Sequence, residues 1–141
     1  MDQSAIFGPV LAMMLLTMLV WVYMYAKRIS FIRSLDLEPQ QMTPGELARL
    51  SPPSVSNPSD NLKNLFEVPV LFYALALYLF AAHAVDPLYV AAAWMFVAFR
   101  ALHSTVHCTI NIIMLRFVLY VISCACIFFM LVRSAIAYAF G

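Results

Sequence analysis

Charged side chains are scarce in this sequence, and their scarcity argues against a soluble protein. Only 11% of the 141 residues are Asp, Glu, Lys or Arg, whereas 65% are hydrophobic. Soluble domains carry about 25% charged residues, and the mean hydropathy of +0.89 is far above their usual range. The sequence therefore predicts an integral membrane protein.

An excess of positive charge is also missing, which argues against nucleic-acid binding. The formal net charge is +1, and the basic residues form no cluster beyond Lys27-Arg28. The start of the chain, Met1-Asp2-Gln3, lacks the basic segment of a secretory signal, and the first apolar run is longer than a signal's hydrophobic region. We expect this run to be retained as a membrane helix.

Cysteine is rare too, with three residues in the chain. Cys108, Cys124 and Cys126 lie within or at the edge of apolar segments, where an oxidising machinery rarely reaches. On a helix, Cys124 and Cys126 would point about 200° apart, so they do not form a redox or chelating pair. We interpret all three as small buried hydrophobic residues.

Long apolar stretches dominate the rest of the chain. They predict an all-α, single-domain membrane four-helix bundle. Its four transmembrane spans cover about residues 6–26, 62–85, 87–111 and 115–140. Asp86-Pro87 ends the second span and starts the third, which predicts a tight antiparallel hairpin.

The segment of about 27–61 is rich in Pro and Ser and predicts a surface loop. Within it, Thr43 as N-cap, Pro44 at the first position and Glu46 as capping-box partner predict a short helix. Five basic residues lie in or beside this loop, namely Lys27, Arg28, Arg33, Arg49 and Lys63. By the positive-inside rule, the loop is cytoplasmic and both termini lie on the opposite side.

One face of the third predicted span is polar. At about 100° per residue, Arg100, His103, His107 and Asn111 share an arc of roughly 80° on a helix. Ionisable groups are costly in a bilayer and persist mainly where they pair with one another or line a polar cavity. This polar face is therefore the first candidate for a functional site.

Glu67 in the second span is the natural partner for that face. Asn64 and Glu67 are neighbours at i, i+3 near the cytoplasmic start of this span, with Pro69 just beyond. We expect a buried ion pair between Glu67 and Arg100, and its loss on one side would be strongly destabilising. The alternative is a purely structural pair that fixes helix register.

The remaining ionisable residues also have more than one interpretation. His103 and His107, at i, i+4, fit metal or haem ligation, but no third ligand is evident and we expect no metal. Arg116 fits either a catalytic group or an interfacial arginine that contacts lipid headgroups. Arg133 is expected to extend toward the far interface.

Three motifs together resemble the MAPEG family, the membrane-associated proteins of eicosanoid and glutathione metabolism. The first two are Asn64-Leu65-Phe66-Glu67-Val68-Pro69 and Arg100-Ala101-Leu102-His103-Ser104, and Arg116 follows them. The resemblance spans the whole chain and implies a homotrimer. Glutathione sites would lie between subunits and open to the cytoplasm.

The resemblance also implies residue roles and an activity. Asn64, Glu67, Arg100 and His103 would bind glutathione, Arg116 would stabilise its thiolate, and His107 would handle the proton. The protein would be a glutathione-dependent transferase or peroxidase. Its substrates would be lipophilic electrophiles or lipid hydroperoxides that arrive from the membrane lipid.

The second hypothesis is a non-catalytic structural or lipid-binding subunit of a larger membrane complex. Asp60 and His107 favour it, because many eukaryotic members have arginine and tyrosine at those places in the motifs. The retained Arg116 favours the enzyme. The missing eukaryotic arginines indicate a bacterial member in the inner membrane.

Overall fold

The chain is entirely helical wherever the computed structural model describes it, over residues 2–35 and 43–140. A short 3-10 helix, Gln3–Ile6, leads into α1. The α-helices are α1 (Phe7–Ser34), α2 (Pro44–Leu50), α3 (Pro53–Leu65), α4 (Val68–Ala81), α5 (Pro87–Cys108) and α6 (Ile113–Phe140). The predicted all-α class is confirmed.

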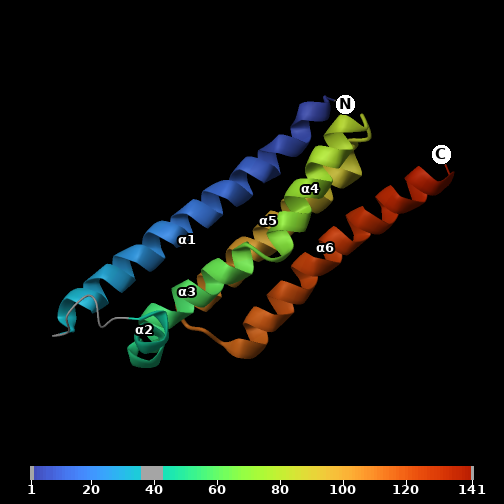
Figure 1. Ribbon diagram of the computed structural model, residues 1–141. Coiled ribbons are helices and arrows are strands. Elements are labelled where there is room, and N and C mark those ends of the chain that lie inside the picture. The colour runs from blue at the N-terminus through green and yellow to red at the C-terminus, as the bar shows by residue number, and fades with distance from the viewer. Residues whose placement is uncertain (1, 36–42, 141) are drawn as a thin grey trace.

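The long helices run side by side, with α1 and α6 on the two outer sides and α3, α4 and α5 between them (Figure 1). The first turns of α1 and the last turns of α6 lie at one end of the bundle. The short helix α2 and the connection from α5 to α6 lie at the other end (Figure 1). The polar half of α5 therefore lies at the end that also holds α2.

Three helical stretches are long and apolar enough to cross a membrane: Gln3–Ser34, Pro53–Ala81 and Ile113–Phe140. The protein is thus an integral membrane protein. Among the described residues, α5 does not qualify, because its own polar residues lower its mean hydropathy. It is nevertheless enclosed by its neighbours, with nine buried residues. The fourth span remains a prediction.

The second predicted span is not one continuous helix. It is divided into α3 and α4, with Phe66 and Glu67 outside both. Pro69 explains the break, because proline has no N–H and its ring clashes with the carbonyl four residues earlier. Glu67 leaves the helical conformation, with φ −96° and ψ −99°.

The expected surface loop of residues 27–61 is shorter than predicted. Helix α1 continues to Ser34 and α3 already begins at Pro53. The Pro52-Pro53 pair was interpreted as loop, but proline is well tolerated in the first turn of a helix, where its missing N–H has no intrahelical partner anyway. Residues 36–42 of this loop lie outside the described residues.

Two predicted helix starts are present in the structure. The Thr43 hydroxyl accepts a hydrogen bond from the backbone N–H of Glu46 at 3.2 Å, but the Glu46 carboxylate binds Arg49 rather than closing a capping box. Asp86 caps α5 by accepting from the N–H groups of Leu88 and Tyr89, both at 3.0 Å. Helix α5 begins at Pro87 as predicted, but α4 ends at Ala81, so residues 82–86 connect the two helices.

Candidate functional site

The polar face of α5 is turned into the protein. Arg100 is 0% exposed, His103 2% and His107 3%. The side chains around them come from three other places: the row of asparagines on α3, the turn between α5 and α6, and the first two turns of α6. We call this set the polar cluster: Asn57, Asn61, Asn64, Arg100, His103, Ser104, His107, Asn111, Arg116 and Tyr120.

Arg100 binds the end of α3 rather than a carboxylate. Its Nη2 donates to the carbonyl oxygen of Asn64 at 2.6 Å. In an unbroken helix this carbonyl would accept from the N–H of Val68, but the helix ends at Leu65 and leaves it free. A cation at the C-terminal end of a helix is also favoured by the helix dipole.

The predicted ion pair between Glu67 and Arg100 is therefore wrong. Glu67 is exposed, and within the described residues no ion pair joins it to the buried guanidinium. The break at Pro69 removes Glu67 from the helical face on which Asn64 lies. Glu67 thus stands at the surface of the break, beside the polar cluster, and Asn64, a half-buried member of the cluster, lies next to the break.

Arg100 retains unused hydrogen-bonding capacity. Its Nε and Nη1 are buried and have no hydrogen-bond partner among residues 2–35 and 43–140. The guanidinium carbon lies 5.4 Å from the centroid of the Tyr120 ring, a cation–π contact. A buried cation with two free nitrogens is expensive to maintain. It is also well suited to bind an anionic group.

The two histidines of the face have different contacts. Nδ1 of His103 donates to the backbone carbonyl of Arg116 at 2.9 Å, so in the neutral ring Nε2 is the unprotonated nitrogen. Nε2 of His103 and Nδ1 of His107 are buried without partners in the described structure. The two rings meet edge to face, with centroids 5.6 Å apart. Both rings thus keep one nitrogen for a proton or a ligand.

Arg116 stands in the first turn of α6 and is half-buried. Its Nη1 donates to Oδ1 of Asn111 at 2.8 Å. Nδ2 of Asn111 in turn donates to Oδ1 of Asn57 on α3 at 3.1 Å. The predicted catalytic arginine is therefore placed at the same end of α5 as His107 and is tied to α3 through two amides.

Asn64 is among the residues predicted for the site, but Asn57 on the same helix α3 is not. Asn57, Asn61 and Asn64 follow i, i+4, i+7 spacing and so share one helical face. Asn61 is fully buried; it accepts from the Ser104 hydroxyl at 3.3 Å and donates to the Cys108 sulfur at 3.5 Å. The spacing is a usable signal for Asn57, but it is hidden when residues 27–61 are interpreted as a loop.

The cysteines are half-buried rather than buried, and all three are free thiols. Asp60, which favoured the non-catalytic hypothesis, binds Lys63 at 2.9 Å on the exposed side of α3. Tyr120, which is not among the predicted site residues, lies against both Arg100 and His103. No group of three or more His, Cys, Asp or Glu side chains in the described ranges could hold a metal ion.

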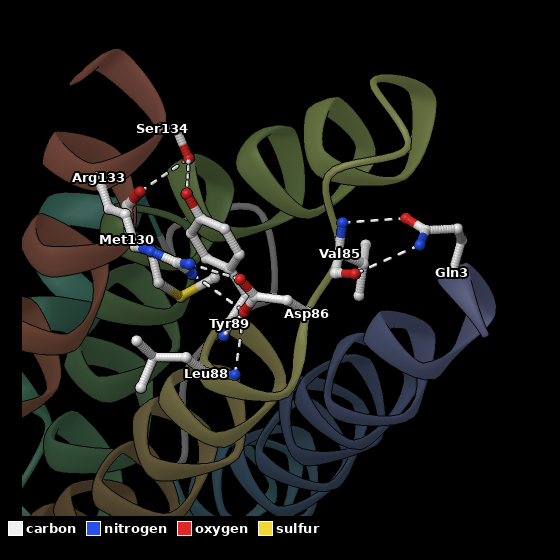
Figure 2. Close-up of polar contacts among 8 residues, drawn as sticks. All are labelled: Gln3, Val85, Asp86, Leu88, Tyr89, Met130, Arg133 and Ser134. Carbon is white, nitrogen blue, oxygen red and sulfur yellow. Dashed lines mark hydrogen bonds and ion pairs between the residues drawn. The ribbon is translucent and has the colours of Figure 1, made fainter. Parts of the chain in front are cut away.

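A second polar group lies at the other end of the bundle, where α4 passes into α5 (Figure 2). Arg133 forms a two-pronged ion pair with Asp86, with Nη1 to Oδ1 at 2.9 Å and Nη2 to Oδ2 at 2.5 Å. Its guanidinium carbon stands 4.2 Å from the Tyr89 ring centroid, and Ser134 donates to the Tyr89 hydroxyl at 3.1 Å. We call Asp86, Tyr89, Arg133 and Ser134 the end clamp.

The end clamp gives Arg133 a partner, Asp86, at the end of the bundle opposite α2. Two parallel hydrogen bonds between a guanidinium and a carboxylate are among the stronger side-chain contacts. Hydrogen bonding from Arg133 lowers the pKa of Asp86 from 3.8 to about 2. The clamp joins α5 to α6 far from the polar cluster and is no part of the candidate site.

Comparison with known sequences agrees with the motifs. The sequence model of the MAPEG family matches residues 6–136, nearly the whole chain. The matched range contains every residue of the polar cluster. No curated protein and no solved structure matched the chain.

Proposed function

Because the chain belongs to the MAPEG family, membrane proteins of eicosanoid and glutathione metabolism, we propose that it is a glutathione-dependent transferase or peroxidase. Its substrates would be lipophilic electrophiles or lipid hydroperoxides. The observation that carries the proposal is the buried Arg100 with two unpartnered nitrogens. Glutathione supplies carboxylates, amides and a thiolate, the kinds of group that such nitrogens bind.

Each predicted residue has a place in this scheme. Arg100 offers Nε and Nη1 to an anionic group of glutathione. Asn64 and Glu67, at the surface of the helix break, bind its remaining polar groups, including the ammonium that a carboxylate can pair with. His103 orients Arg116 through its backbone carbonyl. His107 accepts or returns a proton through its free Nδ1.

Arg116 would stabilise the glutathione thiolate. Its guanidinium cannot lose a proton near neutral pH, so a nearby thiol with an ordinary pKa of about 8.5 would ionise more readily. In conjugation, the sulfur lone pair forms the new C–S bond. In a substitution the displaced electron pair departs with the leaving group, and in an addition it takes up a proton. In hydroperoxide reduction, sulfur attacks the outer oxygen, the O–O bond breaks to release an alcohol, and a second glutathione forms the disulfide and water.

The arrangement in the membrane belongs to the same proposal. Helix α5 crosses the membrane as the fourth span, shielded by α1, α3, α4 and α6. The end of the bundle that holds α2 lies on the cytoplasmic side, because basic residues favour that side. Three copies form the assembly, with glutathione between subunits. This is supported by the exposed Glu67 beside the cluster, because a second subunit would cover it. The expected location is a bacterial inner membrane.

Replacing Arg116 by alanine tests the proposal. The variant keeps the carbonyl that accepts from His103 and loses the guanidinium with its bond to Asn111. Glutathione binding at pH 7 should weaken roughly tenfold, as for one lost charge-assisted hydrogen bond. Isothermal titration of the purified oligomer measures the dissociation constant.

Arg49→Ala is the matched control, because Arg49 is exposed on α2 and its ion pair within the described residues is with Glu46, in its own helix. It should bind glutathione as the wild type does. Absence of binding by a folded wild-type oligomer would contradict the proposed function.

The second candidate is a non-catalytic structural subunit. The contacts Asn57–Asn111 and Asn61–Ser104 favour it, since they hold α3 against α5 and the turn after it without any ligand. The two candidate functions predict different changes in thermal stability when glutathione is added. Glutathione at a hundred times its dissociation constant should stabilise the enzyme by about 2.7 kcal/mol, whereas the structural subunit should not respond.

A further inference from the structure

Asn111 occupies a backbone conformation that few side chains adopt. It lies in the turn between α5 and α6 with φ at 46°, in the left-handed region. Its N–H donates to the carbonyl of Val106 at 2.7 Å and so helps to end α5. Asparagine tolerates this conformation better than most residues that have a side chain. Glycine would tolerate it better still, so the backbone alone does not explain the amide.

The Asn111 amide is used at both of its ends. Its oxygen accepts from Nη1 of Arg116, and its nitrogen donates to Oδ1 of Asn57. The second bond fixes the orientation of the amide and keeps its oxygen turned to Arg116. A continuous hydrogen-bonded chain therefore runs from α3, through the turn, to the guanidinium on α6.

This series of hydrogen bonds differs chemically from an ion pair. A carboxylate would hold the guanidinium more strongly, but it would also cancel the positive charge. Two neutral amides hold the guanidinium in place and leave its charge intact. His103 completes the support by binding the Arg116 carbonyl, so the backbone and the side chain of Arg116 are each held.

We propose that Asn57 and Asn111 are positioning residues that hold the Arg116 guanidinium in place without neutralising it. That this pair helps Arg116 to stabilise a thiolate rests on the proposed function. That the pair holds the Arg116 side chain in place does not rest on it. Neither asparagine touches the reacting atoms in this scheme. Both act through Arg116.

The hold on Arg116 is tested without glutathione, by an arginine-selective dicarbonyl reagent. Protein in liposomes is labelled for increasing times, and the rate at Arg116 is read by peptide mass spectrometry, with exposed Arg49 as the fast reference. Asn111→Gly keeps the left-handed backbone and removes the amide, so the rate should rise roughly fivefold, the factor for one ordinary hydrogen bond. Asn57→Ala should raise it less, because the Asn111 bond remains.

Thr105→Ala is the control, since Thr105 is exposed on α5 and its hydroxyl donates to the carbonyl of Ala101 in the same helix. It should label at the wild-type rate. Equal labelling rates at Arg116 in the wild type and in Asn111→Gly would show that Asn111 does not hold the guanidinium in place.

The role of neutrality is tested by Asn111→Asp. This variant keeps an oxygen for Arg116, so Arg116 should stay protected from the reagent. The added negative charge should raise the pKa of the bound glutathione thiol by about one unit, read from the ultraviolet absorbance of the thiolate against pH. An unchanged thiol pKa would contradict the proposal that the neutral amide of Asn111 preserves the effect of the Arg116 charge on the thiol.

Failure of the wild type to bind glutathione would overturn the proposed function and the pair's role in it. The labelling rates would then still decide whether the pair holds Arg116. The two failures are therefore distinguishable in one set of samples.

Discussion

Arg100→Met is expected to weaken glutathione binding severely while leaving the apo protein about as stable as the wild type. Arg100 is fully buried and makes one hydrogen bond, to the Asn64 carbonyl. Its two remaining nitrogens have no partner in the described structure. Replacement of an incompletely paired buried charge by an apolar side chain of similar volume is often neutral or stabilising.

The two opposing contributions can be weighed. Methionine leaves the Asn64 carbonyl without its donor, at a cost of about 1 kcal/mol. It also removes the desolvation penalty of a buried guanidinium, which amounts to several kcal/mol. The apo variant should therefore melt at or above the wild-type temperature. Glutathione affinity should fall roughly a hundredfold or more, since up to two charge-assisted hydrogen bonds are lost.

Thermal melts of the solubilised oligomer, with and without glutathione, check both halves of this expectation. Arg100→Ala is the comparison, because it removes the same charge but leaves a cavity, which should lower stability by about 2–3 kcal/mol. A methionine variant that melts far below the wild type would instead mark Arg100 as a structural group. Full glutathione affinity in the methionine variant would exclude Arg100 from the site.

The parts of the fold that the sequence predicted depend on local signals. Mean hydropathy identifies α1 and α6, and the Asp86-Pro87 signal identifies the start of α5. The inward direction of Arg100, His103 and His107 follows from helical periodicity together with the cost of ionisable groups in lipid. These features need no knowledge of which helices are neighbours.

The errors come from a proline whose effect was underestimated. Pro69 was noted, yet the second span was predicted as continuous, and Glu67 was assigned to the face that meets Arg100. Once the helix breaks, the carbonyl of Asn64 becomes the acceptor and Glu67 moves to the surface. A proline in a helical pattern could have predicted the break, but not which group would replace the carboxylate.

The end clamp could not be predicted from periodicity, because its two ends are 47 residues apart. Pairing Asp86 with Arg133 requires that α6 returns along α5 in one particular register. Several registers place Arg133 near that end of the bundle, and the sequence does not distinguish them. The same limit applies to Asn57 and Asn111, which lie 54 residues apart.

Breaking the end clamp should destabilise the protein without changing the polar cluster. In Asp86→Ala, Arg133 loses its bidentate partner and α5 loses its N-cap. The pair is about one-third exposed, with 36% for Arg133 and 34% for Asp86, so its contribution lies between those of exposed and buried pairs. Together with the lost cap, the variant should lose about 2–3 kcal/mol of unfolding free energy.

Asp86→Asn separates the two contributions, because its amide oxygen still caps α5 while the negative charge is gone. A double-mutant cycle with Arg133→Met then measures the coupling between positions 86 and 133, which should be about 1–2 kcal/mol. Additive effects of the two substitutions would contradict the ion pair. Glutathione affinity, measured in parallel, should stay at the wild-type value, since the polar cluster lies at the opposite end of α5.

The same pair predicts a dependence of stability on pH. The pKa of Asp86 falls from 3.8 to about 2 in the folded protein, chiefly through hydrogen bonding from Arg133. A carboxyl with a lowered folded-state pKa stabilises the fold at any pH above its unfolded pKa, and that contribution is lost as the pH falls toward the folded value. The wild-type melting temperature should therefore drop between about pH 4 and pH 2 more steeply than that of Asp86→Asn. Parallel curves for the two proteins would show that the acid sensitivity arises at other carboxylates.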